Sequence, residues 1–394
     1  MRFTTFLAAA LAAAAFEVFA AETATPVVVR KTGADKISIS VEASADGAGK
    51  SFTDILMRNL QRSGCFQLVA KNGAIRVTGT AGASGANVVA AGRGKQLTNN
   101  SPYTDAKSAR TRARALSDAI VEAFANQKGF ASSPIALVNR KGSDNAEIYT
   151  CYPDGFDLRP STSDKRAAVG PRWCGNDIYY IGFMKGKPLA YKFNTATGVR
   201  NCLANFKGSV TGLCPSPDGR KVAIVLSHLG NPELFVLDMS ASSLKRLTST
   251  KNGSEASPCW SPDGTKIAYV SDTTRHPQVY VVDIASGKSS RVSNSGTENT
   301  NPTWSNDGRL AWASKRAGGT CIVVTAPGGG GEPVAVTKPG TWEHPAWSRD
   351  NRHLVAQMGG ALFIVDGAMN EADRDAPARI FNNEGNWMSP DWRR

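Results

Sequence analysis

A short stretch that recurs along the chain limits the folds available to it. Its clearest copy, Pro258–Gly264, reads Pro-Cys-Trp-Ser-Pro-Asp-Gly and leads into an alternating apolar run. The third residue of the stretch, which we call the anchor, occurs six times at intervals of 42 to 45 residues. The anchors are Trp173, Pro215, Trp260, Trp304, Trp347 and Trp392. A repeat of roughly 40–50 residues that contains only short strands predicts a β-propeller with one blade for each anchor.

The positions of the strands also predict how the ring closes. The strand that follows an anchor is expected to start near positions 135, 178, 221, 266, 309 and 353. The segment near position 135 has no anchor before it, and the last anchor, Trp392, has no strand after it. We therefore expect the C-terminal strand to pair with Ile135–Val138. This circular closure removes the free edge of the sheet and completes a six-bladed propeller.

The Ser-Pro-Asp-Gly turn has a structural explanation. Proline presets φ, the aspartate accepts a hydrogen bond from the backbone N–H two residues on, and glycine adopts a positive φ. The anchor tryptophan is expected to pack between neighbouring blades. The sequence has no Gly-x-Ser-x-Gly or His-Glu-x-x-His motif, and its four histidines have neither metal nor triad spacing. The pattern predicts a binding protein with no catalytic residues, no metal and no cofactor.

Two regions precede the propeller. Arg2, an Ala-rich apolar stretch and Val18-Phe19-Ala20 are typical of a signal peptide over residues 1–20. A flexible N-terminal segment is expected at residues 21–32. Residues 33–130 combine period-two strands with two amphipathic helices, Ser51–Ser63 and Thr104–Gln127, and predict a small α/β domain. The propeller is then expected at residues 131–394.

Composition narrows the class of protein further. No later segment reaches the ~18 apolar residues of a transmembrane helix, so we expect a soluble exported chain without a transmembrane segment in its mature form. The net charge of +13 favours an acidic partner or an anionic surface, but no nucleic-acid recognition motif accompanies it. There are seven cysteines, and Cys214 and Cys259 both precede an anchor by one residue. We expect these two to be small buried side chains rather than a structural disulfide.

The order of these parts resembles the TolB family of the Tol-Pal system. Ile55–Gln67 is similar to the family's first-helix motif, and Ala74–Gly79 is similar to the strand that follows it. Phe124–Gly129 followed by Ile135–Val138 matches the family's junction into the first blade. The resemblance covers nearly the whole mature chain. It implies a non-enzymatic, monomeric periplasmic protein that supports outer-membrane integrity and cell division.

The resemblance also implies two partners and the residues that bind them. The peptidoglycan-associated lipoprotein Pal would bind at the mouth of the propeller, in the residues just before each anchor. The matching residues are Ser209, Gly212, Glu255, Ala256, Asn299, Thr300, Trp342, Glu343 and Trp387. The inner-membrane protein TolA would bind the N-terminal segment, through Ala21, Glu22, Val27, Val28, Val29 and Arg30. Arg30 and Lys31 make this segment more basic than the acidic and apolar version typical of the family.

Two alternatives remain open from the sequence. Trp342 and Trp387 are either exposed binding residues or residues that pack between blades. The chain is either a protein-binding scaffold or an exported propeller that binds or processes a glycan or another small ligand. A funnel rich in carboxylates and histidines, or a bound metal, would favour the second function.

Overall fold

The computed structural model describes residues 36–394 except positions 143, 185, 205, 330 and 383–384. The predicted signal peptide and the predicted N-terminal segment, with its residues Ala21, Glu22, Val27, Val28, Val29 and Arg30, lie outside the described residues. None of the helices in the described part of the chain combines the length and the apolar character needed to cross a membrane.

The first described region is a mixed sheet. Its strands are β1 (Ile37–Val41), β2 (Ser44–Ala45), β3 (Phe66–Leu68), β4 (Ile75–Ala81), β5 (Gly85–Gly92) and β6 (Lys95–Pro102). The order across the sheet is β3-β1-β4-β5-β6, and the short β2 pairs with β4. β1 runs parallel to β3 and β4, whereas β4, β5 and β6 are antiparallel neighbours. This arrangement confirms the predicted α/β region.

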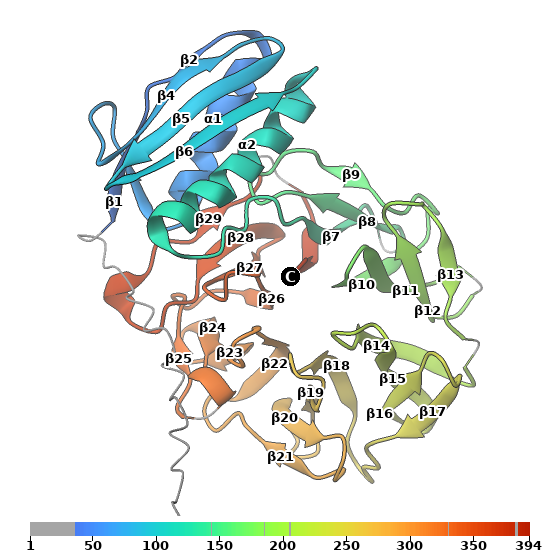
Figure 1. Ribbon diagram of the computed structural model, residues 1–394. Coiled ribbons are helices and arrows are strands. Elements are labelled where there is room, and N and C mark those ends of the chain that lie inside the picture. The colour runs from blue at the N-terminus through green and yellow to red at the C-terminus, as the bar shows by residue number, and fades with distance from the viewer. Residues whose placement is uncertain (1–35, 143, 185, 205, 330, 383–384) are drawn as a thin grey trace, which may run out of the picture. The chain divides into compact units, whose positions relative to one another are not determined.

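Two helices, α1 (Gly47–Arg62) and α2 (Ala106–Ile120), share a core with this sheet (Figure 1). α2 begins at Asp105, whose carboxylate accepts a hydrogen bond from the Ser108 N–H at 2.7 Å. It continues into the π-helical turn η2 (Val121–Ala125). α1 begins four residues before the predicted start at Ser51. Gly49 explains this difference, because a Cβ there would lie 1.7 Å from the Ala81 carbonyl oxygen, so the helix start is fixed by packing against β4.

The rest of the described chain forms six four-stranded sheets, which we number as blades. Blade 1 is β30 (Trp387–Trp392), β7 (Ile135–Arg140), β8 (Ala146–Cys151) and β9 (Arg159–Pro160); blade 2 is β10 (Ala168–Cys174), β11 (Asp177–Gly182), β12 (Leu189–Asn194) and β13 (Arg200–Cys202); blade 3 is β14 (Ser209–Pro215), β15 (Lys221–Leu229), β16 (Asn231–Asp238) and β17 (Ser243–Arg246). Blade 4 is β18 (Glu255–Trp260), β19 (Lys266–Ser271), β20 (Gln278–Asp283) and β21 (Ser289–Arg291); blade 5 is β22 (Glu298–Trp304), β23 (Leu310–Arg316), β24 (Gly319–Val324) and β25 (Val334–Ala335); blade 6 is β26 (Trp342–Trp347), β27 (His353–Met358), β28 (Ala361–Asp366) and β29 (Ala378–Arg379). The first strand of each blade is its inner strand, and Figure 1 shows these strands around a common centre.

Blade 1 is built from both ends of the propeller sequence. β30 pairs antiparallel with β7, with Trp392 opposite Ile135 and Trp387 opposite Asn139. The Trp392 indole N–H donates to the Ser133 carbonyl at 3.0 Å. The ring of Phe130 meets the Trp392 ring edge-on at 5.1 Å between centroids. These contacts confirm the predicted circular closure by the C-terminal strand.

The Ser-Pro-Asp-Gly turn behaves as its residue types predict. In blade 4, the Asp263 carboxylate accepts hydrogen bonds from the Thr265 N–H at 3.0 Å and from the Ser261 hydroxyl at 2.6 Å. Gly264 has a φ of +70°. Blade 3 repeats the Ser–Asp hydrogen bond at 2.6 Å between Ser216 and Asp218. The turn therefore serves the fold.

A buried ion pair joins the α/β region to blade 1. Arg114 on α2 donates to the Asp154 carboxylate at 2.6 Å, and these side chains are 1% and 0% exposed. The same guanidinium donates to Asp157 at 2.7 Å and lies 3.8 Å from the centre of the Tyr152 ring. The charges pair with each other, and the Arg114 guanidinium also stacks on the Tyr152 ring. Removing Arg114 or Asp154 would therefore leave the other charge buried without compensation.

Candidate protein-binding mouth of the propeller

The inner strands begin with three rows of residues that form the candidate site. The first row lies five residues before each anchor, and all six of its members are buried. It consists of Ala168, Val210, Glu255, Asn299, Trp342 and Trp387. The side chains of this row therefore pack among the blades and offer little surface to a partner.

The second row, four residues before each anchor, is accessible. Its members are Val169, Thr211, Ala256, Thr300, Glu343 and Met388, of which Thr211 and Glu343 are exposed and the others are half-buried. Of the other predicted residues, Ser209 is half-buried and Gly212 is buried. The structure thus brings the predicted residues together by strand position, but it separates those that reach solvent from those that do not.

The third row lies three residues before each anchor, and of its members only Gly212 was predicted as a site residue. It consists of Gly170, Gly212, Ser257, Asn301, His344 and Ser389. The pairing of every inner strand with its neighbour shifts register near this position, which marks a β-bulge. Five of these residues have φ between 47° and 61°, and four of the five carry a side chain. Five members of the row, all but Gly212, also precede proline, which disfavours the α region, so the backbone here is strained.

The sequence contained a signal for this third row. A residue followed by proline inside a strand interrupts regular pairing, because proline has no N–H to donate. This dipeptide recurs two residues before each tryptophan anchor, from Gly170-Pro171 to Ser389-Pro390. The pattern predicts an irregularity at the strand but not the positive φ that results.

The two tryptophans of the first row pack between blade elements. The Trp342 indole N–H donates to the Lys338 carbonyl at 3.0 Å, and its ring meets the Phe363 ring edge-on at 5.4 Å. Trp387 lies 4.9 Å from the Phe381 ring and 6.0 Å from the Tyr149 ring. They are 4% and 5% exposed, so the packing role that the sequence left open is the one seen in this structure. Their predicted contact with a partner stays a prediction.

Glu255, also in the first row, belongs to a buried carboxyl pair. The Thr250 hydroxyl lies between the two carboxyl groups, 3.3 Å from a carboxylate oxygen of Glu255 and 3.3 Å from one of Glu233 of blade 3. Ser271 donates to the other oxygen of Glu255 at 3.2 Å. Burial, and then the negative charge of Glu233, raises the pKa of Glu255 to about 7. The carboxyl group therefore takes up a proton near neutral pH.

The next blade junction has the same geometry with neutral groups. Asn299 is 0% exposed, and its amide donates to the Gln278 side-chain oxygen at 2.9 Å. The Trp312 indole N–H donates to the Asn299 oxygen at 2.7 Å. An amide pair, which satisfies donor and acceptor together, takes the place of the carboxyl pair here, and the Arg291 guanidinium donates to the same Gln278 oxygen at 2.8 Å.

At the anchor end, the inner strands enclose a central cavity of about 200 Å³. Arg172 of blade 2 and Asp391 of blade 1 line it and are 3.4 Å apart. Burial and the positive charge of Arg172 lower the pKa of His344 to about 4, so that imidazole is neutral at neutral pH. Among the described residues, no group of three or more His, Cys, Asp and Glu side chains is placed to hold a metal ion.

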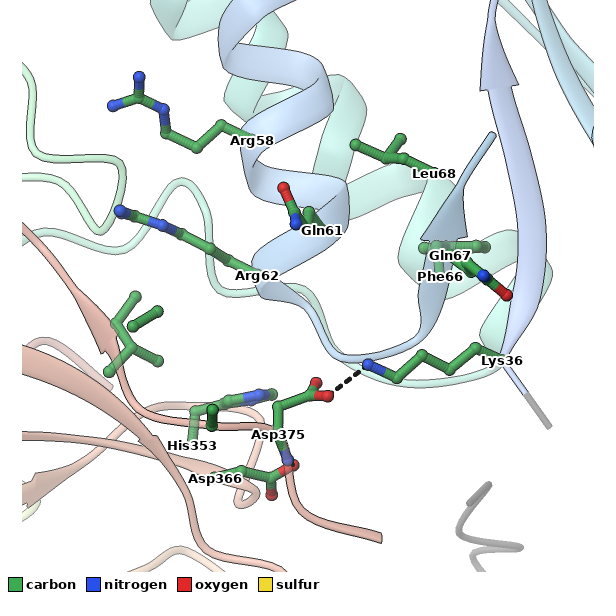
Figure 2. Close-up of a pocket in the computed structure, with 13 residues that line it drawn as sticks. Lys36, Arg58, Gln61, Arg62, Phe66, Gln67, Leu68, His353, Asp366 and Asp375 are labelled. Carbon is green, nitrogen blue, oxygen red and sulfur yellow. Dashed lines mark hydrogen bonds and ion pairs between the residues drawn. The ribbon is translucent and has the colours of Figure 1, made fainter. Parts of the chain in front are cut away.

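A larger cavity, of about 580 Å³, lies beside α1 and blade 6. Figure 2 shows Arg58 and Arg62 reaching out from α1, with Lys36 joined to Asp375. Arg58 donates to the Asp154 carbonyl at 2.9 Å, and Arg62 donates to the Arg379 carbonyl at 2.9 Å. The basic groups of this cavity are thus used to join the α/β region to the propeller.

Comparison with known proteins assigns the family. The sequence model described as the TolB beta propeller domain matches residues 121–394, well over half of the chain. The chain belongs to the TolB β-propeller family. A curated relative from Aromatoleum aromaticum, named Tol-Pal system protein TolB, is 28% identical over 239 residues, which are 53% of this chain and 55% of the relative. The chain thus spans about half the length of that relative in the alignment.

A solved TolB structure shares the fold over most of the chain. The crystal structure of TolB from Acinetobacter baumannii superimposes with a TM-score of 0.77 at 22% identity, over 92% of this chain and 98% of that chain. This agreement extends beyond the propeller and includes the α/β region. It confirms the predicted fold of a TolB-family chain, with a small N-terminal α/β part and a six-bladed propeller.

Proposed function

We propose that the chain is a non-enzymatic periplasmic scaffold that binds a Pal-like peptidoglycan-associated lipoprotein at the mouth of its propeller. Membership of the TolB family supports this function, and so does the name of the curated relative, Tol-Pal system protein TolB. The observation that carries the proposal is the contrast between the buried first row and the second row, none of whose members is buried. The second row offers different side chains from the six blades.

The chemistry of the accessible rows fits a polar protein surface. Glu343 is exposed, Thr300 and Asn301 are half-buried and polar, and Met388 is a flexible apolar side chain. Protein interfaces place a few such apolar contacts inside a polar rim. The third row adds strained backbone, which is typical of sites that must hold a side chain in one direction. The buried residues Glu255, Asn299, Trp342 and Trp387 would then position the strand starts rather than touch the partner.

We further propose that residues 1–20 are a signal peptide and that residues 21–32 bind a TolA-like inner-membrane protein. In this proposal, residues 33–130 form the α/β domain and residues 131–394 form the propeller. The chain would thus connect a partner bound at the propeller with a partner bound at residues 21–32. The resemblance of the sequence to the TolB family supports this arrangement. A chain of this kind would act as a monomer and would support outer-membrane integrity and cell division. It would not bind nucleic acid.

Capture of partners by the mature chain tests the class of function. Immobilised residues 21–394 should recover a Pal-like lipoprotein from a periplasmic extract, and a chain that starts at residue 33 should still do so. Only the longer chain should recover a TolA-like protein. Recovery of glycans without any lipoprotein would overturn the proposal in favour of a ligand-binding propeller.

A charge reversal tests the mouth itself. Glu343→Lys should weaken binding of the lipoprotein by about ten-fold, because a charge at the interface changes sign. Glu371→Lys makes the same charge change at an exposed position of the 3-10 turn η4 (Glu371–Asp373), away from the three rows, and should change the affinity less than two-fold. Titration calorimetry with both variants measures this difference. Equal affinities for the two variants would remove the mouth as the binding site.

A further inference from the structure

Two cysteines of neighbouring blades meet beside the central cavity. Cys214 ends β14 next to its anchor, Cys259 holds the same position in β18, and each is 6% exposed. Both line the cavity and belong to one packed cluster with Trp260. The Trp260 indole N–H donates to the Cys214 carbonyl at 3.0 Å, which holds the two strand ends together. The strands that carry them, β14 and β18, are neighbouring inner strands in contact with each other.

The surroundings of this pair favour one thiolate and one thiol. Contact with the Cys214 thiol lowers the pKa of Cys259 to about 6 although burial opposes this, and the charges of Arg394 and Arg172 lower it further. Contact with Cys259, together with burial, raises the pKa of Cys214. A thiolate is the form of cysteine that reacts with oxidants, and a neighbouring thiol can then resolve the product.

The other cysteines differ from this pair. All seven cysteines lie in the described part of the chain, and all are free thiols. Burial raises the pKa of Cys65 to about 11 and raises the pKa of Cys151, Cys174 and Cys321 as well. Cys202 is exposed on the outer strand of blade 2. Cys259 is thus the cysteine whose environment favours the thiolate.

We propose that Cys214 and Cys259 form a redox modification site, at which a small peroxide converts the two thiols into a disulfide between blades 3 and 4. The cavity of about 200 Å³ beside them has room for a molecule of this size. The site goes beyond partner binding, because it lies at the anchor end of the inner strands. If the chain is exported as proposed above, the pair works in an oxidising compartment.

The reaction balances with hydrogen peroxide as the oxidant. The Cys259 thiolate attacks one peroxide oxygen, the O–O bond breaks, and hydroxide leaves to give a sulfenic acid on Cys259. The Cys214 sulfur then attacks the Cys259 sulfur, and the sulfenic hydroxyl leaves as water with the Cys214 proton. In total, two thiols lose two electrons and two protons, and one hydrogen peroxide becomes two water molecules.

A peptide map of the oxidised chain tests the pairing. The reduced full mature chain is treated with hydrogen peroxide, its free thiols are blocked with N-ethylmaleimide under denaturing conditions, and the digest is analysed by mass spectrometry without reduction. We expect two fewer maleimide adducts and one cross-linked pair of peptides that contain Cys214 and Cys259, both reversed by dithiothreitol. A cross-link through Cys174, or a sulfinic acid on Cys259 without any cross-link, overturns the proposal.

Variants and a pH series make the test independent of folding defects. Cys214→Ser and Cys259→Ser should each abolish the cross-link, whereas Cys321→Ser, a buried cysteine of blade 5, should retain it. The map of the unaltered chain decides the pairing even where a variant fails to fold. The rate of disulfide formation should rise about ten-fold per pH unit below pH 6 and level off above pH 7. A rate that continues to rise to pH 9 would show that Cys259 is not the reacting thiolate.

Discussion

The two ends of each inner strand follow different rules. At the anchor end, blades 3, 4 and 6 repeat one turn, and the Ser–Asp hydrogen bond measures 2.6 Å in each of them. At the mouth end, the first row contains alanine, valine, glutamate, asparagine and tryptophan at equivalent positions. The anchor end therefore repeats one chemistry in these blades, whereas the mouth end differs from blade to blade.

The difference shows which part of the repeat the backbone determines. The tight turn needs a side-chain acceptor and a residue with a positive φ, so few residue types satisfy these two positions, whereas proline is replaced by Arg349 in blade 6. The mouth end needs only a bulge, which serine, asparagine, histidine and glycine all occupy in this chain. Residue type at the mouth is therefore free to serve contacts between blades or with a partner.

Removal of the closing strand should have the largest effect on this ring. Deletion of residues 387–394 removes β30 and leaves β7 as an unpaired edge beside blade 6. It also removes the buried Trp387 and Trp392 and their packing against the Phe381 and Phe130 rings. We expect the cooperative unfolding transition of the propeller to disappear, measured by calorimetry and near-UV circular dichroism.

The control for this deletion is a chain that lacks Arg394 alone. Arg394 contacts the Trp304 carbonyl but lies outside β30, so its removal keeps the strand. This control should retain a transition close to that of the full chain. If the chain without residues 387–394 melted at the same temperature as the control, closure by β30 would not hold the ring.

At the anchor end, the largest single-residue effect is expected at Asp350 in blade 6. Its carboxylate accepts hydrogen bonds from the N–H groups of Arg352 and His353, both at 2.9 Å, and lies 2.6 Å from the His353 ring nitrogen Nδ1. Its side chain is 4% exposed. Asp350→Ala would leave these buried donors without an acceptor, so we expect a loss of about 3 kcal/mol in the free energy of unfolding, measured by urea titration.

The same change in blade 4 is a matched control. Asp263 accepts hydrogen bonds only from the Ser261 hydroxyl and the Thr265 N–H, in a more exposed turn, so Asp263→Ala should cost about 1 kcal/mol. Although burial opposes it, contact with His353 and Ser348 lowers the pKa of Asp350 to about 2. Its stabilising contribution is therefore present above the ordinary pKa of 3.8 and is lost as the pH falls through 2. Equal losses in the free energy of unfolding for Asp350→Ala and Asp263→Ala would contradict a larger contribution from the Asp350 turn of blade 6.

The sequence was sufficient to predict the features that the repeat determines. Five of the six inner strands end at their anchor, and β10 ends one residue after Trp173. The inner strand of blade 1 was predicted because Trp392 is an anchor with no strand after it. Local patterns were less informative where packing decides the outcome. The start of α1 at Gly47 depends on the close approach of Gly49 to Ala81. The apolar periodicity of the sequence does not reveal this contact.

The predicted mouth residues lie at the starts of the inner strands, and their role in binding stays a prediction. Period-two alternation cannot say which of these residues reach solvent. A bulge reverses the alternation at that point, and the bulge depends on pairing with the neighbouring strand. The burial of Glu255 depends on Glu233 from another blade, which is also invisible in a single strand.

The smallest effect is expected at the mouth end, from Glu255. Its pKa is raised to about 7 from an ordinary 4.5, so the folded chain binds this proton more tightly than the unfolded chain. Its contribution to stability is complete below pH 4.5 and is lost as the pH rises through 7. Glu255→Gln removes the second carboxyl group beside Glu233, and should raise the free energy of unfolding by about 1–2 kcal/mol at pH 8 but not at pH 4.

The quantity to measure is the difference in the free energy of unfolding between the variant and the unaltered chain at each pH. This difference removes the pH dependence that comes from Asp118 and Asp391, because burial also raises the pKa of these two residues. Glu298→Gln is the matched control, since this carboxylate is 40% exposed and pairs with Lys315 at the surface. The control should shift the free energy of unfolding by less than about 0.5 kcal/mol, with no added dependence on pH. If Glu255→Gln and Glu298→Gln changed the free energy of unfolding in the same way at every pH, Glu255 would have no special effect on stability at the junction of blades 3 and 4.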